Sequence, residues 1–73
     1  MTLDDAPLGR PARVSTTDVD PTLTRRLAEL GIRAGQPVTP VHRTAGGGRV
    51  LAVGDTRLVL ARSVLRRITV TAP

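Results

Sequence analysis

Apolar residues recur at helical spacing in one stretch of the chain, residues 20–35. Leu23, Leu27 and Leu30 lie three or four positions apart, so a helix would place all three on one face. The residues between them are mostly polar or charged and would face solvent. The pattern therefore predicts a short amphipathic helix with one face directed towards a core.

The ends of this helix also carry recognisable sequence signals. Asp20 can accept hydrogen bonds from the amide groups of a first helical turn, and Pro21 suits the first position because it has no N–H group to leave unpaired. Gly31 can adopt the left-handed conformation in which helices commonly end, and Gly35 permits a second tight turn. We expect the helix to begin at Pro21 and to end near Gly31.

The remaining apolar residues alternate with polar ones, which is typical of strands. A further short segment, residues 62–66, is expected to form one helical turn. Glycine-containing turns separate the strands. The expected strands cover residues 12–15, 38–43, 49–53, 56–61 and 67–71.

The second of these strands contains two prolines, Pro37 and Pro40. Proline cannot donate a backbone hydrogen bond, so this strand is expected to lie at a sheet edge or to contain a bulge. Regular alternation would place Val38, Pro40 and His42 on one face. The glycines at 46–48 form the tip of the hairpin that follows.

Five short strands and one helix favour a mainly β fold, a closed or nearly closed small barrel in which the first and last strands meet. With 73 residues the chain is one domain with a small core. Residues 1–7 contain two adjacent aspartates and are expected to form a flexible tail that contributes little. The barrel is then expected to cover residues 8–73.

The composition is basic and lacks aromatic residues. The net charge is +5, and all 11 basic residues are arginine. Such a charge is compatible with nucleic acid binding through phosphate contacts, which is the alternative function we consider. The absence of aromatic residues removes the stacking platforms of single-strand binders, and the absence of lysine indicates a general composition bias. We therefore do not expect nucleic acid to be the main partner.

Neither catalysis nor a resident metal or other cofactor is expected. The chain has no cysteine, and its one histidine, His42, has no metal-ligating residue near it in sequence. Asp20 is better explained as a helix cap than as a cation ligand. The glycines at 46–48 lack the Lys-Ser/Thr that follows the glycines of a phosphate-binding loop. No activated nucleophile is apparent either.

No segment approaches the roughly 20 consecutive apolar residues that span a bilayer. The first residues also lack the apolar run of a secretory signal. We therefore expect a cytoplasmic protein that reaches a membrane only through a partner.

Residues 26–35, with the sequence RLAELGIRAG, resemble the RLxELGIxxG motif of FeoA proteins and FeoA-like domains. The resemblance continues through the glycine hairpin tip, Gly54 and the terminal Ile-Thr-Val, so it covers nearly all of residues 8–70. Three departures are Pro40 in place of a β-branched residue, Gly-Gly-Gly-Arg at 46–49 in place of Gly-Asp-Pro, and Leu65 in place of alanine.

This resemblance implies an SH3-like barrel with the helix inserted after the first strand. It also implies a cytosolic accessory role in ferrous iron uptake, beside the membrane transporter FeoB and its G-protein domain. Similar domains occur at the C-terminus of DtxR-like metal-dependent repressors. Because no helix-turn-helix precedes the barrel in this sequence, we expect the transport accessory rather than the repressor.

Partner contacts are expected around the helix and its exit, because recognition residues tend to lie on fixed loops of a rigid scaffold. The candidate residues are Arg26, Leu30, Ile32 and Arg33. A second arginine cluster, Arg62, Arg66 and Arg67, is expected to lie on the outer side of the short helical turn. The sequence leaves the oligomeric state open.

Overall fold

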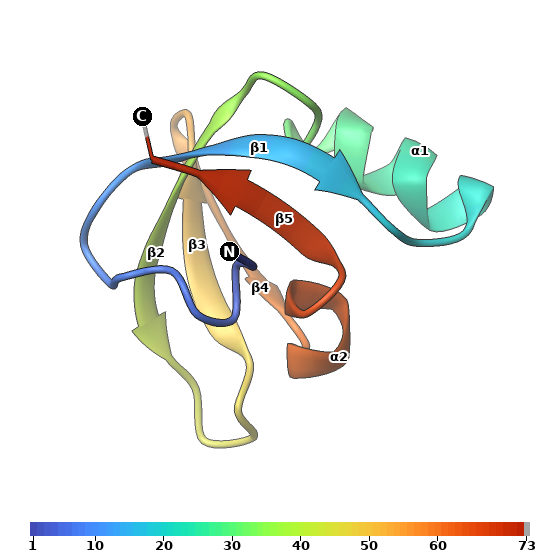
Figure 1. Ribbon diagram of the computed structural model, residues 1–73. Helices are drawn as coiled ribbons and strands as arrows, with labels where there is room; N and C mark the ends of the chain where they lie inside the picture. The colour runs from blue at the N-terminus through green and yellow to red at the C-terminus, as the bar shows by residue number, and fades with distance from the viewer. Residues whose placement is uncertain (73) are drawn as a thin grey trace.

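The computed structural model describes residues 1–72 and contains five strands and two short helices (Figure 1). The expected helix begins at Pro21, and the turn expected after the fourth strand forms a second helix. Pro73, the last residue of the expected barrel, lies outside the described residues. The elements are β1 (Ala12–Thr17), α1 (Pro21–Glu29), β2 (Pro37–Arg43), β3 (Arg49–Val53), β4 (Thr56–Leu60), α2 (Arg62–Leu65) and β5 (Ile68–Thr71).

The five strands form one antiparallel sheet in the order β4-β3-β2-β1-β5. The sheet is strongly bent, so that β1 and β5 cross over β2, β3 and β4 (Figure 1). The first and last strands pair, with Val14 opposite Val70, which confirms that prediction. Both residues are buried, so this pairing closes one side of the core.

Strand β2 pairs with β1 and β3 and so does not lie at a sheet edge, but it contains the bulge that was the other structure expected from its prolines. Pro40 lies opposite Leu51 and His42 lies opposite Val50, so the register shifts by one residue between these pairs. The extra residue reverses the alternation. Pro40 is buried but His42 is exposed, and the expectation that these two residues share a face is therefore wrong.

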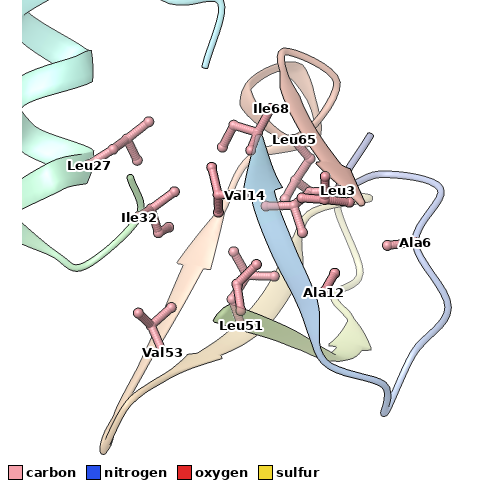
Figure 2. Close-up of a cluster of buried hydrophobic side chains, with 12 residues drawn as sticks. Leu3, Ala6, Ala12, Val14, Leu27, Ile32, Leu51, Val53, Leu65 and Ile68 are labelled. Atoms are coloured by element: carbon pink, nitrogen blue, oxygen red, sulfur yellow. The ribbon is translucent and has the colours of Figure 1, made fainter. Parts of the chain in front are cut away.

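One hydrophobic core fills the space inside the bent sheet (Figure 2). Leu27, on α1, and Ile32 cover the end of the core between α1 and the sheet (Figure 2). Of the leucine stripe on α1, Leu27 is buried, Leu23 is half-buried and Leu30 is 44% exposed. The buried residues are Leu3, Ala6, Ala12, Val14, Leu27, Ile32, Val38, Leu51, Val53, Leu65, Ile68 and Val70.

The N-terminal segment packs into this core, which corrects the expectation that residues 1–7 contribute little. The Leu3 side chain is 0% exposed and that of Ala6 is 1% exposed. The Leu3 amide donates to the Ile68 carbonyl oxygen at 2.9 Å, and the Val70 amide donates to the Met1 carbonyl oxygen at 2.8 Å. The segment thus covers the free edge of β5 and supplies two apolar side chains that the strands lack.

None of the helices in residues 1–72 is long and apolar enough to cross a membrane.

Candidate functional site

The residues expected to contact a partner lie at the C-terminal end of α1, but they do not all face solvent. Arg26 and Arg33 are exposed, and Leu30 is half exposed. Ile32 is only 1% exposed and belongs to the core, so its assignment as a contact residue is corrected. We call Arg26, Leu30 and Arg33 the helix-exit surface.

Ile32 is buried because of the way in which α1 ends. The Gly31 amide donates to the Ala28 carbonyl oxygen at 3.0 Å, and the Ile32 amide donates to the Leu27 carbonyl oxygen at 2.8 Å. This pair of bonds is the Schellman motif, which normally brings the residue after the glycine against the residue three positions before the helix cap. Here those residues are Ile32 and Leu27, and both are buried.

The loop that carries Arg33 is fixed to β1 at its far end. The Gly35 amide donates to the Val14 carbonyl oxygen at 2.8 Å, and the Val14 amide donates to the Gln36 carbonyl oxygen at 3.0 Å. Arg13 Nη1 also donates to the Gly35 carbonyl oxygen at 2.6 Å. The backbone of Arg33 is therefore held between the Schellman motif and the sheet, while its side chain remains exposed.

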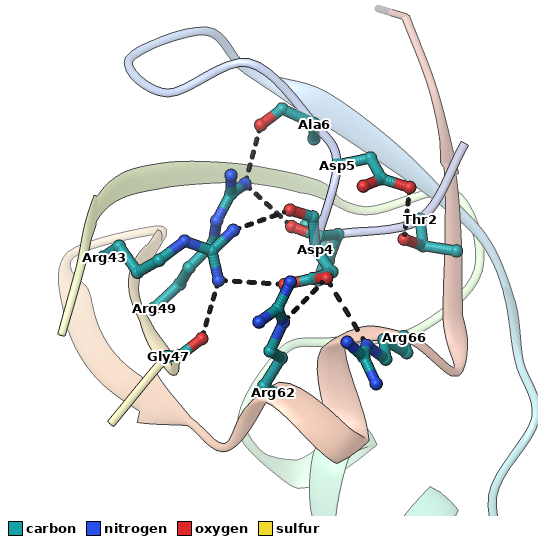
Figure 3. A network of polar contacts seen from close by, with 10 residues as sticks. Thr2, Asp4, Asp5, Ala6, Arg43, Gly47, Arg49, Arg62 and Arg66 are labelled. Atoms are coloured by element: carbon teal, nitrogen blue, oxygen red, sulfur yellow. Dashed lines mark hydrogen bonds and ion pairs between the residues drawn. The ribbon is translucent and has the colours of Figure 1, made fainter. Parts of the chain in front are cut away.

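A second group of polar residues, which lie far apart in the sequence, centres on Asp4 (Figure 3). The Asp4 side chain is only 6% exposed. Arg43 Nη1 lies 2.9 Å from Asp4 Oδ1, and Arg62 Nε lies 3.2 Å from Asp4 Oδ2. Arg66 Nε approaches the same Oδ2 at 3.6 Å. One carboxylate thus lies against three guanidinium groups, from β2, α2 and the residue that caps α2.

Arg49, next to this group, fastens the N-terminal segment to the barrel. Its side chain is buried, and its Nη1 donates to the carbonyl oxygens of Leu3 at 2.9 Å and Ala6 at 2.6 Å. Its Nε has no hydrogen-bond partner in residues 1–72. Burial lowers the pKa of the guanidinium from its usual value, and the nearby charge of Arg43 lowers it further.

The predicted second arginine cluster is divided between two places. Arg62 and Arg66 face Asp4, whereas Arg67 Nη1 lies 3.7 Å from the carboxylate of Asp18. We call Arg62 and Arg66 the α2 arginine pair. The position of Asp4 between the apolar residues Leu3 and Ala6 is a weak sequence indication that this carboxylate is buried.

The family of the chain follows from a match that spans the whole described fold: the model of the FeoA domain matches residues 1–72. The chain belongs to the FeoA family. The match includes the N-terminal segment, in agreement with its place in the core. Among curated proteins, no sequence matches this chain. Members of this family are accessory factors of ferrous iron transport.

Solved FeoA structures share the fold of this FeoA chain. The FeoA protein from Chlorobium tepidum is 25% identical, with a TM-score of 0.90 over 99% of this chain and 70% of that one. FeoA from Stenotrophomonas maltophilia, complexed with zinc, is 37% identical, with a TM-score of 0.77 over 96% of this chain and 88% of that one. It is described as a prokaryotic SH3 domain protein proposed to act as a bacterial ferrous iron transport activating factor. The predicted SH3-like fold is thereby confirmed.

The same fold occurs as part of a manganese-dependent transcriptional repressor. That protein is 21% identical, with a TM-score of 0.85, and the FeoA chain aligns over its full length with 41% of the repressor. This likeness shows the fold alone.

In residues 1–72 of this FeoA chain, no three histidine, cysteine or acidic side chains lie close enough together to hold a metal ion. His42 is exposed on β2, beyond the bulge. Asp4, the most buried acidic side chain, is surrounded by arginines, which compete with any cation for its oxygens. The Asp4 cluster is therefore suited to anions and not to metal cations.

The ionisation of Asp4 should make the stability of this FeoA chain depend on pH. The hydrogen bond from Arg43 lowers the pKa of Asp4, and Arg62 lowers it further by a hydrogen bond and by its charge. A carboxyl group with a lowered folded pKa stabilises the fold above its unfolded pKa of about 3.9 and loses that contribution as the pH falls through the folded pKa. Wild type should therefore exceed Asp4→Asn in free energy of unfolding by a constant amount at neutral pH, and this difference should shrink below about pH 4.

Urea denaturation of both proteins at several pH values between 7 and 3 measures this difference. Asp55→Asn is the control, because Asp55 is exposed in the turn after β3 and has no ion pair in residues 1–72. A difference between wild type and Asp4→Asn that stays constant down to pH 3 would contradict the role assigned to the Asp4 carboxylate.

Proposed function

We propose that this chain is a non-enzymatic, cytoplasmic accessory protein that docks on the cytosolic part of the FeoB transporter and modulates or assembles it. The family membership supports a role in ferrous iron transport. The helix-exit surface supports docking, and its fixed loop is the observation that carries the proposal. Arg33 projects from a backbone anchored at both ends, so little backbone entropy remains to be lost when a partner binds.

The chemistry of this surface favours an acidic partner face. Arg26 and Arg33 are exposed and form no ion pair within residues 1–72, so both guanidinium groups are available. Arginine can bind a carboxylate through two parallel hydrogen bonds. Leu30, half exposed between them in sequence, adds an apolar contact. A mixed surface of this kind resembles the polar rim and apolar centre of transient interfaces.

Isothermal titration calorimetry with the purified cytosolic domain of FeoB tests the proposal. Arg33→Glu should weaken binding by about tenfold or more, because it replaces attraction to a carboxylate with repulsion. Arg57→Glu is the matched control: Arg57 is exposed on β4, has no ion pair in residues 1–72, and its reversal changes the net charge equally. Binding that Arg33→Glu leaves unaltered would remove the helix-exit surface from the proposal.

A further inference from the structure

The residues around Asp4, which we call the Asp4 cluster, have a net positive charge. Arg43, Arg49 and the α2 arginine pair contribute four positive charges, while Asp4 and the adjacent Asp5 contribute two negative charges. Like charges at such short range repel each other unless a counter-charge is present. Arg62 and Arg66 are the most exposed of the four arginines, so an external anion can reach them.

Arg43 and Arg49 are already used in holding the fold. Arg43 Nη1 donates to Asp4 Oδ1 at 2.9 Å and to the Gly47 carbonyl oxygen at 2.6 Å, and its Nη2 donates to the Asp4 carbonyl oxygen at 2.8 Å. Arg49 is buried against the carbonyl oxygens of the N-terminal segment. These two residues therefore have little capacity left for an external ligand.

The α2 arginine pair is bound differently, because each side chain approaches Asp4 only through its Nε. The Nη groups of Arg62 and Arg66 have no hydrogen-bond partner in residues 1–72. Arg62 is 51% exposed and Arg66 is 61% exposed. They lie four positions apart along α2 and its cap, so they occupy the same side of that element.

Asp4 also brings the two guanidinium groups together. Their Nε atoms lie 3.2 and 3.6 Å from one oxygen, Asp4 Oδ2, which keeps the two groups close together (Figure 3). The β2–β3 hairpin tip lies beside Arg62, since a Cβ atom built on Gly47 would be at van der Waals distance, 3.4 Å, from Arg62 Cδ. A binding site that is already ordered loses less entropy when it takes up a ligand.

We propose that the outer Nη groups of Arg62 and Arg66 bind a doubly charged tetrahedral oxyanion, a phosphate or phosphate monoester. Two arginine forks can pair with two edges of one tetrahedral dianion, whose charge also balances the local surplus of two. A single carboxylate offers only two oxygens and one negative charge, and it would leave half of the site unused. This site is separate from the helix-exit surface, so each can be tested without the other.

The probe is inorganic phosphate, added to ¹⁵N-labelled full-length protein at pH 7.5 while NaCl keeps the ionic strength constant. We expect saturable shifts of the Nε–Hε signals of Arg62 and Arg66 and of the backbone amide signals of α2, with a Kd on the order of 1 mM. The amide signals also report binding in variants that lack these two arginines. The Arg62→Gln/Arg66→Gln double variant should bind at least about tenfold more weakly. The Arg25→Gln/Arg57→Gln double variant removes the same charge from exposed positions elsewhere and should bind as wild type does.

A second variant keeps the experiment informative if loss of both charges unfolds the protein. Arg62→Lys/Arg66→Lys retains the charges that balance Asp4 but lacks the planar guanidinium fork. It should therefore fold, and its affinity for phosphate should be several-fold lower than that of wild type. Lowering the pH to 5.5 should weaken phosphate binding to wild type, because the dianion becomes a monoanion. Acetate that shifts the same signals with equal affinity would overturn the proposal. Phosphate shifts of the α2 amide signals that the Gln double variant retains with unchanged affinity would also overturn it.

Phospholipid vesicles distinguish a lipid headgroup from a soluble compound as the source of the phosphate group. Co-sedimentation with phosphatidic acid vesicles, lost in the Arg62→Gln/Arg66→Gln variant, would assign the site to a phosphomonoester headgroup at a membrane surface. Phosphate binding without co-sedimentation would assign it to a soluble phosphate compound. The absence of both would overturn the proposal.

Discussion

Replacing Arg49 with methionine is expected to lower the free energy of unfolding by about 2–4 kcal/mol. The change removes the buried donor to the carbonyl oxygens of Leu3 and Ala6 and leaves both without that partner. Each unsatisfied buried group costs about 1–3 kcal/mol, and relief from burying an arginine with an unpaired Nε offsets part of this cost. A chain of this length is stable by only roughly 4–11 kcal/mol, so a large share of the stability would be lost.

The loss should appear first in the N-terminal segment. Urea denaturation measures the change in free energy, and hydrogen exchange of the Leu3 and Ala6 amides, both hydrogen-bonded in the native fold, reports local release. Arg57→Met is the control, because Arg57 is exposed on β4 and contacts no N-terminal carbonyl. Unchanged stability and unchanged exchange of both amides in Arg49→Met would show that Arg49 does not fasten the segment.

The helix was predictable because its signals are local. Asp20 Oδ1 accepts the Leu23 amide at 2.8 Å, Pro21 occupies the first turn, and Gly31 has a φ of 96° at the end of the helix. The prolines likewise predicted an edge strand or a bulge for β2, and the bulge is what forms, because the missing N–H group acts within its own strand. Each of these features depends on a few neighbouring residues, which a sequence displays directly.

The N-terminal segment and the Asp4 cluster were not predictable in the same way. Arg49 lies 46 positions from Leu3, and Arg62 lies 58 positions from Asp4, so their contacts depend on the finished fold. An acidic pair near the start of a chain is typical of a solvated terminus. Here the apolar residues Leu3 and Ala6 decide the outcome. The free energy gained by burying their side chains exceeds the conformational entropy that a free terminus would keep.

The mistaken assignment of Ile32 has a local cause that the sequence does contain. A glycine after a helix followed at once by a large apolar residue is the pattern of a Schellman motif, in which that residue packs against the last turn. The exposed position next to it, Arg33, keeps its predicted place in the helix-exit surface. The proposed partner of this surface could not be predicted from the same local patterns, because it depends on the shape and charge of another protein.

Gly31→Ala is expected to lower the free energy of unfolding by about 2–5 kcal/mol, through two separable causes. Gly31 has a φ of 96°, which costs an alanine about 1–2 kcal/mol. A Cβ atom at this position would also lie 2.8 Å from Val53 Cγ1, inside the core, and relieving that overlap costs about 1–3 kcal/mol more. The helix end, and with it the helix-exit surface, is thus built on a residue that has no room for a side chain.

Gly35→Ala separates the two causes, because Gly35 has a φ of 88° but no atom within 4 Å of its ideal Cβ position. It should lose only the backbone cost of about 1–2 kcal/mol. In a double-mutant cycle, Val53→Ala should remove the overlap, so Gly31→Ala/Val53→Ala should cost less than the sum of the single changes. Urea denaturation of the four variants measures each step. Equal losses in Gly31→Ala and Gly35→Ala, with strict additivity in the cycle, would show that the contact with Val53 is not what requires glycine at position 31.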